Sequence, residues 1–168
     1  MQRIHLDNII EAVSDVKTGE RILLSGTVYT ARDAAHKRIH EMMDIDMELP
    51  FPIKNSAIYY AGPTPTPKGA VIGSCGPTTS SRMDIYTPRL LDAGLKCMIG
   101  KGERSQSVID AIKRNNAVYL CAIGGAGALA AQCIEEMEVI AFEDLGCESI
   151  KRLVIKDFPL IVSVKSID

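Results

Sequence analysis

The chain has 168 residues, of which 46% are hydrophobic, and a formal net charge of −2 at pH 7. This length suits one compact domain and is short for two, so we predict a single domain over residues 1–168. The nearly balanced charge, without a run of like charges, argues against a nucleic-acid-binding face and against nucleic acid as a partner.

The cysteines and the longest uncharged segment indicate in which compartment of the cell the protein lies and whether it spans a membrane. Five cysteines are widely spaced, without a Cys-x-x-Cys pair, which favours free thiols of a cytoplasmic protein over a disulfide framework or a zinc site. The first six residues alternate polar and apolar side chains, so we expect no signal peptide. Residues 117–134 carry no charge, but three glycines divide them, and we predict a buried strand, turn and helix with no membrane span.

The first half of the chain alternates short strands and helices. In chain order we predict a strand, a short helix, a long strand, a helix and a short strand over residues 1–6, 8–13, 21–30, 34–43 and 57–60. Asp33 stands just before the second helix, where its carboxylate can cap the free backbone N–H groups. Residues 62–69 contain three prolines and predict a stiff connector.

Residues 73–88 concentrate small and hydroxyl side chains. The apolar residues 70–72 predict a strand that breaks at Gly73, and Pro77 then fixes a turn. The consecutive hydroxyl residues 78–81 precede Arg82 and a segment with helical apolar spacing. These hydroxyls can cap that helix, or with Arg82 they can form an anion-binding cradle at its N-terminus. The segment alone leaves both interpretations open.

The second half of the chain is more regular. We predict strands over residues 95–99, 117–123 and 139–142, separated by helices over residues 105–115 and 126–137. This alternation is typical of a parallel sheet with right-handed crossovers. Two further strands, residues 152–155 and 160–164, are too close together for an intervening helix, so they should pair antiparallel. The predicted fold class is therefore α/β, a single domain with a mixed sheet.

Two histidines on the helix over residues 34–43 lie at metal-ligand spacing. His36 and His40 are four residues apart and share one face of that helix. Lys37 and Arg38 place positive charge beside them, and no third ligand is evident. We therefore favour structural histidines over a metal site.

A glycine-rich segment after the strand over residues 117–123 fits a dinucleotide-binding pattern. Residues 125–130 match G-x-G-x-x-A, and Glu143 follows the next predicted strand. Only antiparallel strands are expected after it, so the second half of a Rossmann sheet is missing. We prefer close packing of a helix on a strand, which also requires small residues, and keep nucleotide binding as the alternative.

Three cations lie where a predicted strand or turn gives way to a helix. They are Arg32, Arg82 and Lys101, the last between Gly100 and Gly102. Such positions form the usual ligand-binding edge of an open α/β sheet. Arginine binds carboxylates bidentately and lysine adds a movable charge, so these side chains suit a small dianionic substrate.

A series of short motifs follows from about residue 19 to the C-terminus. They are Ser25-Gly26, Arg32-Asp-Ala-Ala-His-Lys-Arg38, Tyr60-Ala-Gly-Pro63, Gly76-Pro-Thr-Thr-Ser-Ser-Arg-Met83, Ile99-Gly-Lys-Gly102, Gly124-Gly-Ala126 and Phe142-Glu-Asp-Leu-Gly146. Together they resemble the β subunit, or C-terminal domain, of the iron-sulfur class I fumarate hydratase and L-tartrate dehydratase family. The resemblance implies a swivelling β/β/α domain in an enzyme that reversibly adds water to a trans double bond. It also implies a larger α portion in which three cysteines hold a [4Fe-4S] cluster, and this chain has no matching cysteine cluster.

The resemblance implies roles for four residues. Thr78 matches the family's proposed base for the C3 proton of malate, and Arg32, Arg82 and Lys101 match its substrate-carboxylate ligands. The chain is then a cytoplasmic β subunit that hydrates fumarate to L-malate only in a hetero-oligomer with a cluster-bearing α subunit. The alternatives are an L-tartrate dehydratase β subunit, a nucleotide-binding regulatory module and a non-catalytic scaffold subunit. Self-association of the isolated chain is left open.

Overall fold

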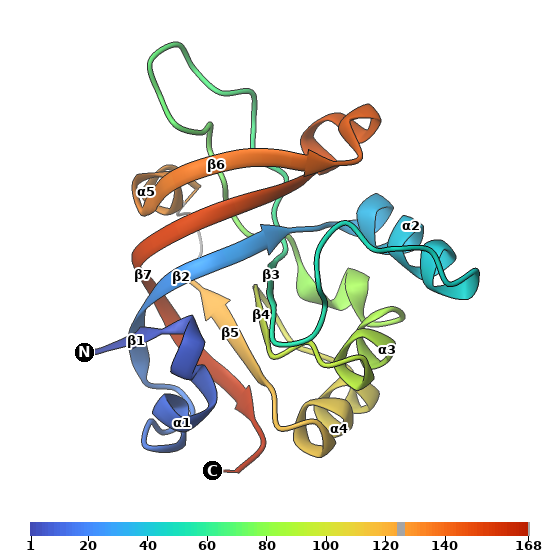
Figure 1. The fold of residues 1–168 in the computed structure, drawn as a ribbon. Helices are drawn as coiled ribbons and strands as arrows, with labels where there is room; N and C mark the ends of the chain where they lie inside the picture. Colours follow the sequence, from blue (N-terminus) through green and yellow to red (C-terminus); the bar gives the residue numbers. More distant parts are fainter. Residues whose placement is uncertain (124–126, 168) are drawn as a thin grey trace.

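The computed structural model describes residues 1–123 and 127–167. Its strands form one seven-stranded mixed sheet in the order β1-β2-β3-β4-β5-β7-β6 (Figure 1), which confirms the predicted α/β class. The elements, with η for 3₁₀ helices, are β1 (Gln2–His5), η1 (Leu6–Asn8), α1 (Ile9–Ser14), β2 (Arg21–Thr30), α2 (Asp33–Asp44), β3 (Ala57–Tyr59), η2 (Ser80–Met83), α3 (Thr87–Asp92), β4 (Cys97–Gly100), α4 (Gln106–Arg114), β5 (Val118–Ala122), α5 (Gly127–Gln132), β6 (Ile134–Ala141), η3 (Glu143–Glu148) and β7 (Ile150–Lys165). None of the described helices is both long enough and apolar enough to cross a membrane.

Strand β7 closes the sheet on itself. It pairs antiparallel with β2, and also with β6 in its first half and β5 in its second half. The strands β2, β3, β4 and β5 are joined by parallel pairs. The five strands β2-β3-β4-β5-β7 therefore form a closed, barrel-like ring, to which β1 and β6 add at the outside.

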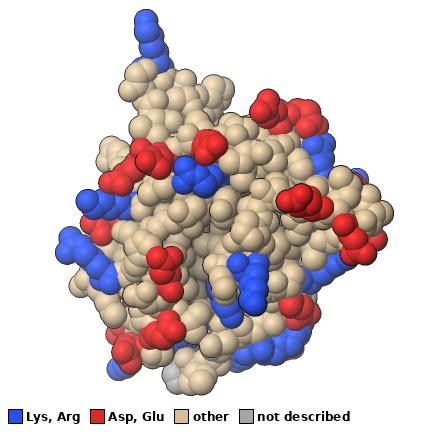
Figure 2. Space-filling model, viewed as in Figure 1, with Lys and Arg blue, Asp and Glu red and all other residues tan. Residues whose placement is uncertain are grey.

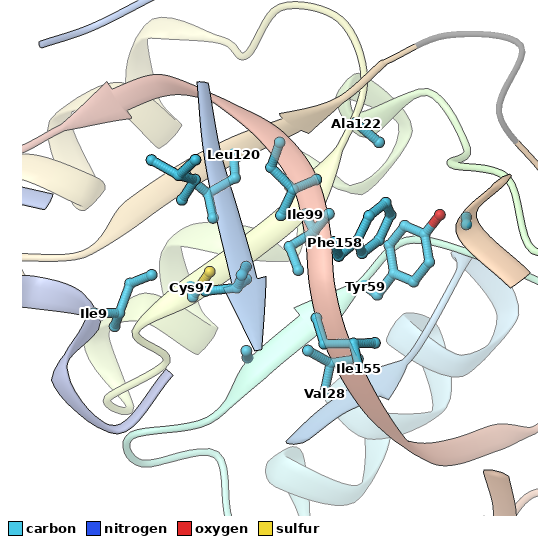
Figure 3. Close-up of a cluster of buried hydrophobic side chains, with 14 of the residues drawn as sticks. Ile9, Val28, Tyr59, Cys97, Ile99, Leu120, Ala122, Ile155 and Phe158 are labelled. Atoms are coloured by element: carbon cyan, nitrogen blue, oxygen red, sulfur yellow. The ribbon is translucent and has the colours of Figure 1, made fainter. Parts of the chain in front are cut away.

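Side chains alternate between the inside and the outside of this ring, because successive residues of a strand point to opposite faces. Inside the ring, Tyr59 and Leu120 pack with Phe158 in an apolar core (Figure 3). Their neighbours in sequence, Tyr60 and Tyr119, belong to a second core that lies between the ring and the helices α2, α3 and α4. Figure 1 shows these three helices together on one side of the ring. We refer to the core inside the ring as the inner core, and to the core between the ring and these helices as the outer core.

The sequence predicts a hairpin over residues 152–164, and this prediction is wrong because β7 is one strand of 16 residues. Asp157 has a left-handed backbone, with φ of 49°, and Pro159 has no N–H to donate. Both residues lie between the part of β7 that pairs with β6 and the part that pairs with β5. The turn-like sequence therefore marks a change of neighbouring strand rather than a reversal of the chain.

The helix predicted over residues 126–137 is wrong in its second half. Helix α5 ends at Gln132, and β6 begins at Ile134. Because β6 pairs with β7 and is antiparallel to it, it is not the third strand of a parallel βαβαβ unit. The exposed glutamates of β6, at positions 135, 136 and 138, suit an edge strand that faces solvent.

Residues 60–79 form an irregular loop, and the strand predicted over residues 70–72 is absent from it. Its four prolines cannot donate the hydrogen bonds of a strand ladder. The loop is held by a hydrogen bond of 2.9 Å from Thr64 N–H to Ser74 O and by Ile72 and Cys75, whose side chains are buried in the inner core. Burial raises the pKa of the Cys75 thiol to about 12, so this anchor is neutral.

Candidate functional site

The carboxyl ends of β2, β3 and β4 meet at one edge of the ring. After β2, Ala31 N–H donates to Tyr59 O at 3.1 Å. After β3, Tyr60 N–H donates to Ile99 O at 2.8 Å. The long loop returns to the same edge, because Thr78 N–H donates to Tyr60 O at 2.6 Å. Edges where strands give way to loops are where α/β proteins usually bind ligands.

Arg32 follows β2 and occupies the cap position of α2. Its side chain is half-buried and lies against Gly62, where an added Cβ would be 2.9 Å from Arg32 Cδ. A side chain at position 62 would therefore displace the guanidinium. The Nε of Arg32 is buried and has no hydrogen-bond partner among the described residues. A buried N–H without an acceptor is costly, so this group is available for a ligand oxygen.

Arg82 lies in η2 and pairs with Asp33, the first residue of α2. Arg82 Nε donates to Asp33 Oδ2 at 2.9 Å, and Nη2 lies 2.6 Å from the same oxygen. The prediction that Asp33 caps α2 is wrong, because the Ala34 N–H instead donates to Glu148 Oε1 at 3.1 Å. The carboxylate of Asp33 serves to hold Arg82 beside the start of α2.

Thr78 and Lys101 are held at this edge by their neighbours. Lys101 forms a parallel bridge with Thr79, and its N–H donates to Ser80 Oγ at 3.0 Å. The Lys101 side chain is exposed, and the half-buried Thr78 makes no side-chain hydrogen bond to any described residue. The structure thus brings all four predicted site residues to one edge of the ring, while their roles stay predictions.

The hydroxyl residues 78–81 do not cap a helix. The segment after them is not one helix but η2 followed by α3, and neither begins with a side-chain cap. Ser80 is buried, and its Oγ also lies 2.7 Å from the Tyr119 hydroxyl, within hydrogen-bond distance. Ser80 is therefore structural, whereas Thr78 keeps a hydroxyl that no described residue binds.

Sequence reasoning misses Arg104, which is buried beneath this edge. Its Nε donates to Asp84 Oδ1 at 2.7 Å, and its Nη2 donates to the Tyr60 hydroxyl at 3.1 Å and to Thr87 Oγ1 at 2.9 Å. The guanidinium also lies over the rings of Tyr60 and Tyr119. Arg104 could have been found from its position between a predicted strand and a predicted helix, because the predicted site cations occupy similar positions.

His36 is buried behind Arg32 on α2. Its backbone N–H and its Nδ1 both bond to the Arg32 carbonyl, at 2.9 and 2.8 Å, and its ring contacts Tyr60 and Tyr86. A carbonyl oxygen only accepts, so we assign the proton to Nδ1. Burial lowers the pKa of His36 to about 4, so the ring is neutral at pH 7. These contacts support a structural histidine that fixes the backbone of Arg32.

Two cavities are lined by residues other than the four predicted site residues. One, of about 560 Å³, lies at the amino ends of β3 and β4, and the other, of about 570 Å³, lies between residues 63–66 and β6. At the predicted site Arg82 and Lys101 are exposed, so the site is an open surface rather than an enclosed pocket. Basic and acidic side chains are interspersed on the face that Figure 2 shows.

One family accounts for almost the entire chain: the sequence profile described as the fumarase C-terminus matches residues 1–167. The chain belongs to the fumarase C-terminus family. Fumarate hydratase 2 of Leishmania major is 42% identical over 161 residues, which are 95% of this chain and 28% of that protein. The anaerobic class I fumarate hydratase of Escherichia coli K12 is also 42% identical, over 95% of this chain and 29% of its own length. A Methanocaldococcus jannaschii protein, provisionally named L(+)-tartrate dehydratase subunit beta, is 36% identical over 92% of this chain and 82% of its own length.

Membership of the fumarase C-terminus family confirms the resemblance that the motifs indicate. The chain spans less than a third of the length of the fumarate hydratases that it matches. The activity of those longer proteins therefore comes to this chain only as a proposal.

The described residues of this member of the fumarase C-terminus family do not offer ligands for an iron-sulfur cluster. Residues 1–123 and 127–167 contain no group of three or more His, Cys, Asp or Glu side chains that could hold a metal ion. Cys75 and Cys97 are buried in the inner core, where burial raises the pKa of both thiols. Such clusters are held by thiolates, so the described residues do not fit one.

The dinucleotide pattern is described only in part, because residues 124–126 lie outside the described chain. Its remainder begins α5, a helix of six residues that leads into β6, and Glu143 falls in η3. Since β6 is antiparallel to its partner β7, the described residues do not form the parallel βαβ unit on which dinucleotide binding depends.

Proposed function

We propose that the chain is the β subunit of a hydro-lyase that reversibly hydrates fumarate to L-malate, and that it is inactive without a partner chain. The observation that carries this proposal is the grouping of three cations and Thr78 at one open edge, where no described residue bonds to the Thr78 hydroxyl or to the buried Nε of Arg32. The relatives named fumarate hydratase support the same reaction.

The charge of this edge suits a dicarboxylate. Arg32, Arg82 and Lys101 supply three positive charges to this edge, of which Arg82 is paired with the Asp33 carboxylate, and such cations suit a substrate with two negative charges. An arginine can donate two parallel N–H bonds to a carboxylate, so it fixes the orientation of the substrate as well as its position. The ion pair with Arg82 also neutralises Asp33, which would otherwise repel the dianion.

Thr78 is proposed to transfer the proton at C3. In the dehydration of malate its deprotonated oxygen takes the C3 proton as the C2–O bond breaks, and the departing hydroxide takes up a proton, so that fumarate and water are formed. In hydration its hydroxyl returns a proton to C3 as hydroxide adds at C2. A threonine hydroxyl is a very weak acid, so its deprotonated form requires the nearby cations and a proton acceptor on the partner.

The partner is proposed to be an α subunit that holds a [4Fe-4S] cluster, since the described residues of this chain do not fit one. The exposed Arg82 and Lys101 need a second surface over them to exclude water from the bound substrate. The relative named as a β subunit supports a hetero-oligomer. The five free cysteines support a cytoplasmic location.

L-tartrate dehydration is the second candidate. It is favoured by the M. jannaschii relative, because the chain covers 82% of that protein. The two hydroxy diacids differ by one hydroxyl, and a site built to hydrogen-bond that group would reject the analogue that lacks it.

The test is anaerobic co-expression with candidate α subunits, followed by turnover of fumarate and L-tartrate. We expect activity only in the complex, and we expect Arg82→Met to lower kcat/KM by at least about 100-fold, because truncating one side of a desolvated ion pair costs about 3 kcal/mol. Arg89→Met is the matched control, since Arg89 pairs with Asp44 at the other end of α2. An unaffected Arg82→Met complex, or equal losses in both variants, would contradict the proposal.

A further inference from the structure

Arg104 connects the two segments that carry Arg82 and Lys101. Its side chain is fully buried, and its Nε donates to Asp84 Oδ1 at 2.7 Å. The Ser105 N–H donates to the other oxygen of Asp84 at 2.8 Å. Asp84 lies two residues after Arg82, and Arg104 lies three residues after Lys101. The ion pair between Arg104 and Asp84 therefore joins the turn that carries Arg82 to the loop that carries Lys101.

Tyr119 joins the same two segments a second time. Its hydroxyl lies 2.7 Å from Ser80 Oγ, at the start of η2, and 2.8 Å from Gly102 O, just after Lys101. The Arg104 guanidinium lies over the Tyr119 ring, 4.7 Å from its centroid. Since Tyr119 belongs to β5, both segments are fixed to the rigid ring rather than only to each other.

The position suits arginine better than lysine. Burial alone would lower the pKa of Arg104, but the Tyr60 hydroxyl and the Asp84 carboxylate outweigh it and raise that pKa above its ordinary value. The side chain therefore stays charged. Its planar guanidinium reaches Asp84, Tyr60 and Thr87 at once, whereas a lysine ammonium is a compact charge that cannot span the three.

We propose that Arg104 is a positioning residue, which sets the distance between the Arg82 and Lys101 side chains and thereby the affinity of the site for a dicarboxylate. This inference rests on the proposed function. Arg104 itself is buried and does not contact the substrate. Its effect on binding comes through the backbone of the two segments that it holds together.

The experiment compares Arg104→Lys with Arg114→Lys in the assembled complex. For Arg104→Lys we expect a higher KM for fumarate and a fall in kcat/KM of about 10- to 100-fold, because a displacement of about 1 Å in a site can cost about 100-fold. Arg114 pairs with Asp92 as Arg104 pairs with Asp84, but its side chain is 50% exposed. We therefore expect the kinetic constants of Arg114→Lys to stay within about twofold of the wild type.

A purely structural role gives a different result. If Arg104→Lys only lowers the folded fraction, the apparent kcat falls while KM is unchanged, and this outcome overturns the inference. If that variant fails to assemble, Tyr119→Phe removes only the hydroxyl between Ser80 and Gly102. A rise in its KM supports the inference, and an unchanged KM overturns it. A wild-type complex without turnover overturns the proposed function itself, whereas an active wild type with unaffected variants overturns only the role of Arg104.

Discussion

Tyr59 and Tyr60 are neighbours in the sequence and both are fully buried, yet they lie in different cores. Tyr59 points into the ring, where it packs edge-on against Phe158 with ring centroids 5.5 Å apart and donates its hydroxyl to the Cys75 carbonyl. Tyr60 points outward, and its hydroxyl accepts a hydrogen bond from Arg104. Tyr59, the last residue of β3, and Tyr60, which follows it, thus serve an apolar core on one side and a polar network on the other.

The two cores contribute differently to the stability of the fold and to the geometry of the candidate site. The inner core is a continuous set of buried hydrophobic side chains, so it stabilises the fold through the area that it removes from water. Beside the outer core lie the buried polar residues Ser80, Thr87 and Arg104. Arg104 donates hydrogen bonds to Thr87 and Tyr60, and Ser80 Oγ lies 2.7 Å from the Tyr119 hydroxyl. Such a network adds little net stability but restricts geometry. We therefore expect changes inside the ring to alter stability, and changes to the polar network to alter substrate affinity.

The largest effect on stability is expected from Phe158→Ala. Phe158 is 2% exposed, and removing a buried phenylalanine side chain costs about 3–5 kcal/mol because it leaves a cavity. Urea unfolding of the isolated chain measures this loss. In the assembled complex the fraction that remains folded should keep its KM. Ile45→Ala is the control, because Ile45 is 68% exposed and its truncation should change stability by less than about 0.5 kcal/mol. A large rise in KM for Phe158→Ala would show that the two cores are not separate in function.

A smaller effect on stability, confined to a defined range of pH, is expected from the titration of His36. Burial lowers the pKa of His36 from 6.5 to about 4 in the folded chain, so between these values the unfolded chain binds more protons. The contribution of the neutral His36 to the free energy of unfolding is fully present above pH 6.5. About 3 kcal/mol of it is lost as the pH falls to about 4. Asparagine can still donate to the Arg32 carbonyl but does not titrate, so His36→Asn should flatten this part of the pH profile.

Urea unfolding between pH 4 and pH 7 checks the prediction for His36. The control is Ile45→Ala, because Ile45 is exposed and does not titrate. Asp92 and Asp144 act at lower pH, since Arg114 and Arg38 hold the pKa of these two carboxyls below the ordinary 3.8. If the wild type and His36→Asn lose equal stability between pH 6.5 and pH 4, the buried histidine is not neutral in the folded chain.

The regular elements could be predicted where burial imposes a clear period. The strand over residues 21–30 and the helix over residues 105–115 agree with β2 and α4 to within one residue, because one face of each is buried. The full extent of strands β6 and β7 could not be predicted in this way. The continuity of β7 depends on pairing with β2, β5 and β6, which are distant in sequence, whereas the local sequence around Asp157 and Pro159 is typical of a turn.

The candidate site could be predicted in part. Arg32 and Lys101 follow strands whose ends the apolar pattern indicates, so a shared edge follows from the parallel topology. The pair between Arg82 and Asp33 could not be predicted, because it depends on the path of an irregular loop of about twenty residues. The burial of Arg104 likewise depends on tyrosines that arrive from β5 and from the end of β3. The role of Thr78 comes from the family resemblance alone and remains a proposal.

The most direct test of the account is the turnover number of the assembled complex that carries Thr78→Ala, measured beside Thr79→Ala. Thr79 is the next hydroxyl residue and is exposed, so it controls for the loss of a hydroxyl at this edge. We predict that Thr78→Ala lowers kcat for fumarate hydration by about 100- to 10,000-fold, the usual contribution of a positioned proton-transfer group, with KM nearly unchanged. Thr79→Ala should turn over fumarate nearly as fast as the wild type. A Thr78→Ala complex that hydrates fumarate at the wild-type rate would contradict the account and leave this chain as a scaffold subunit.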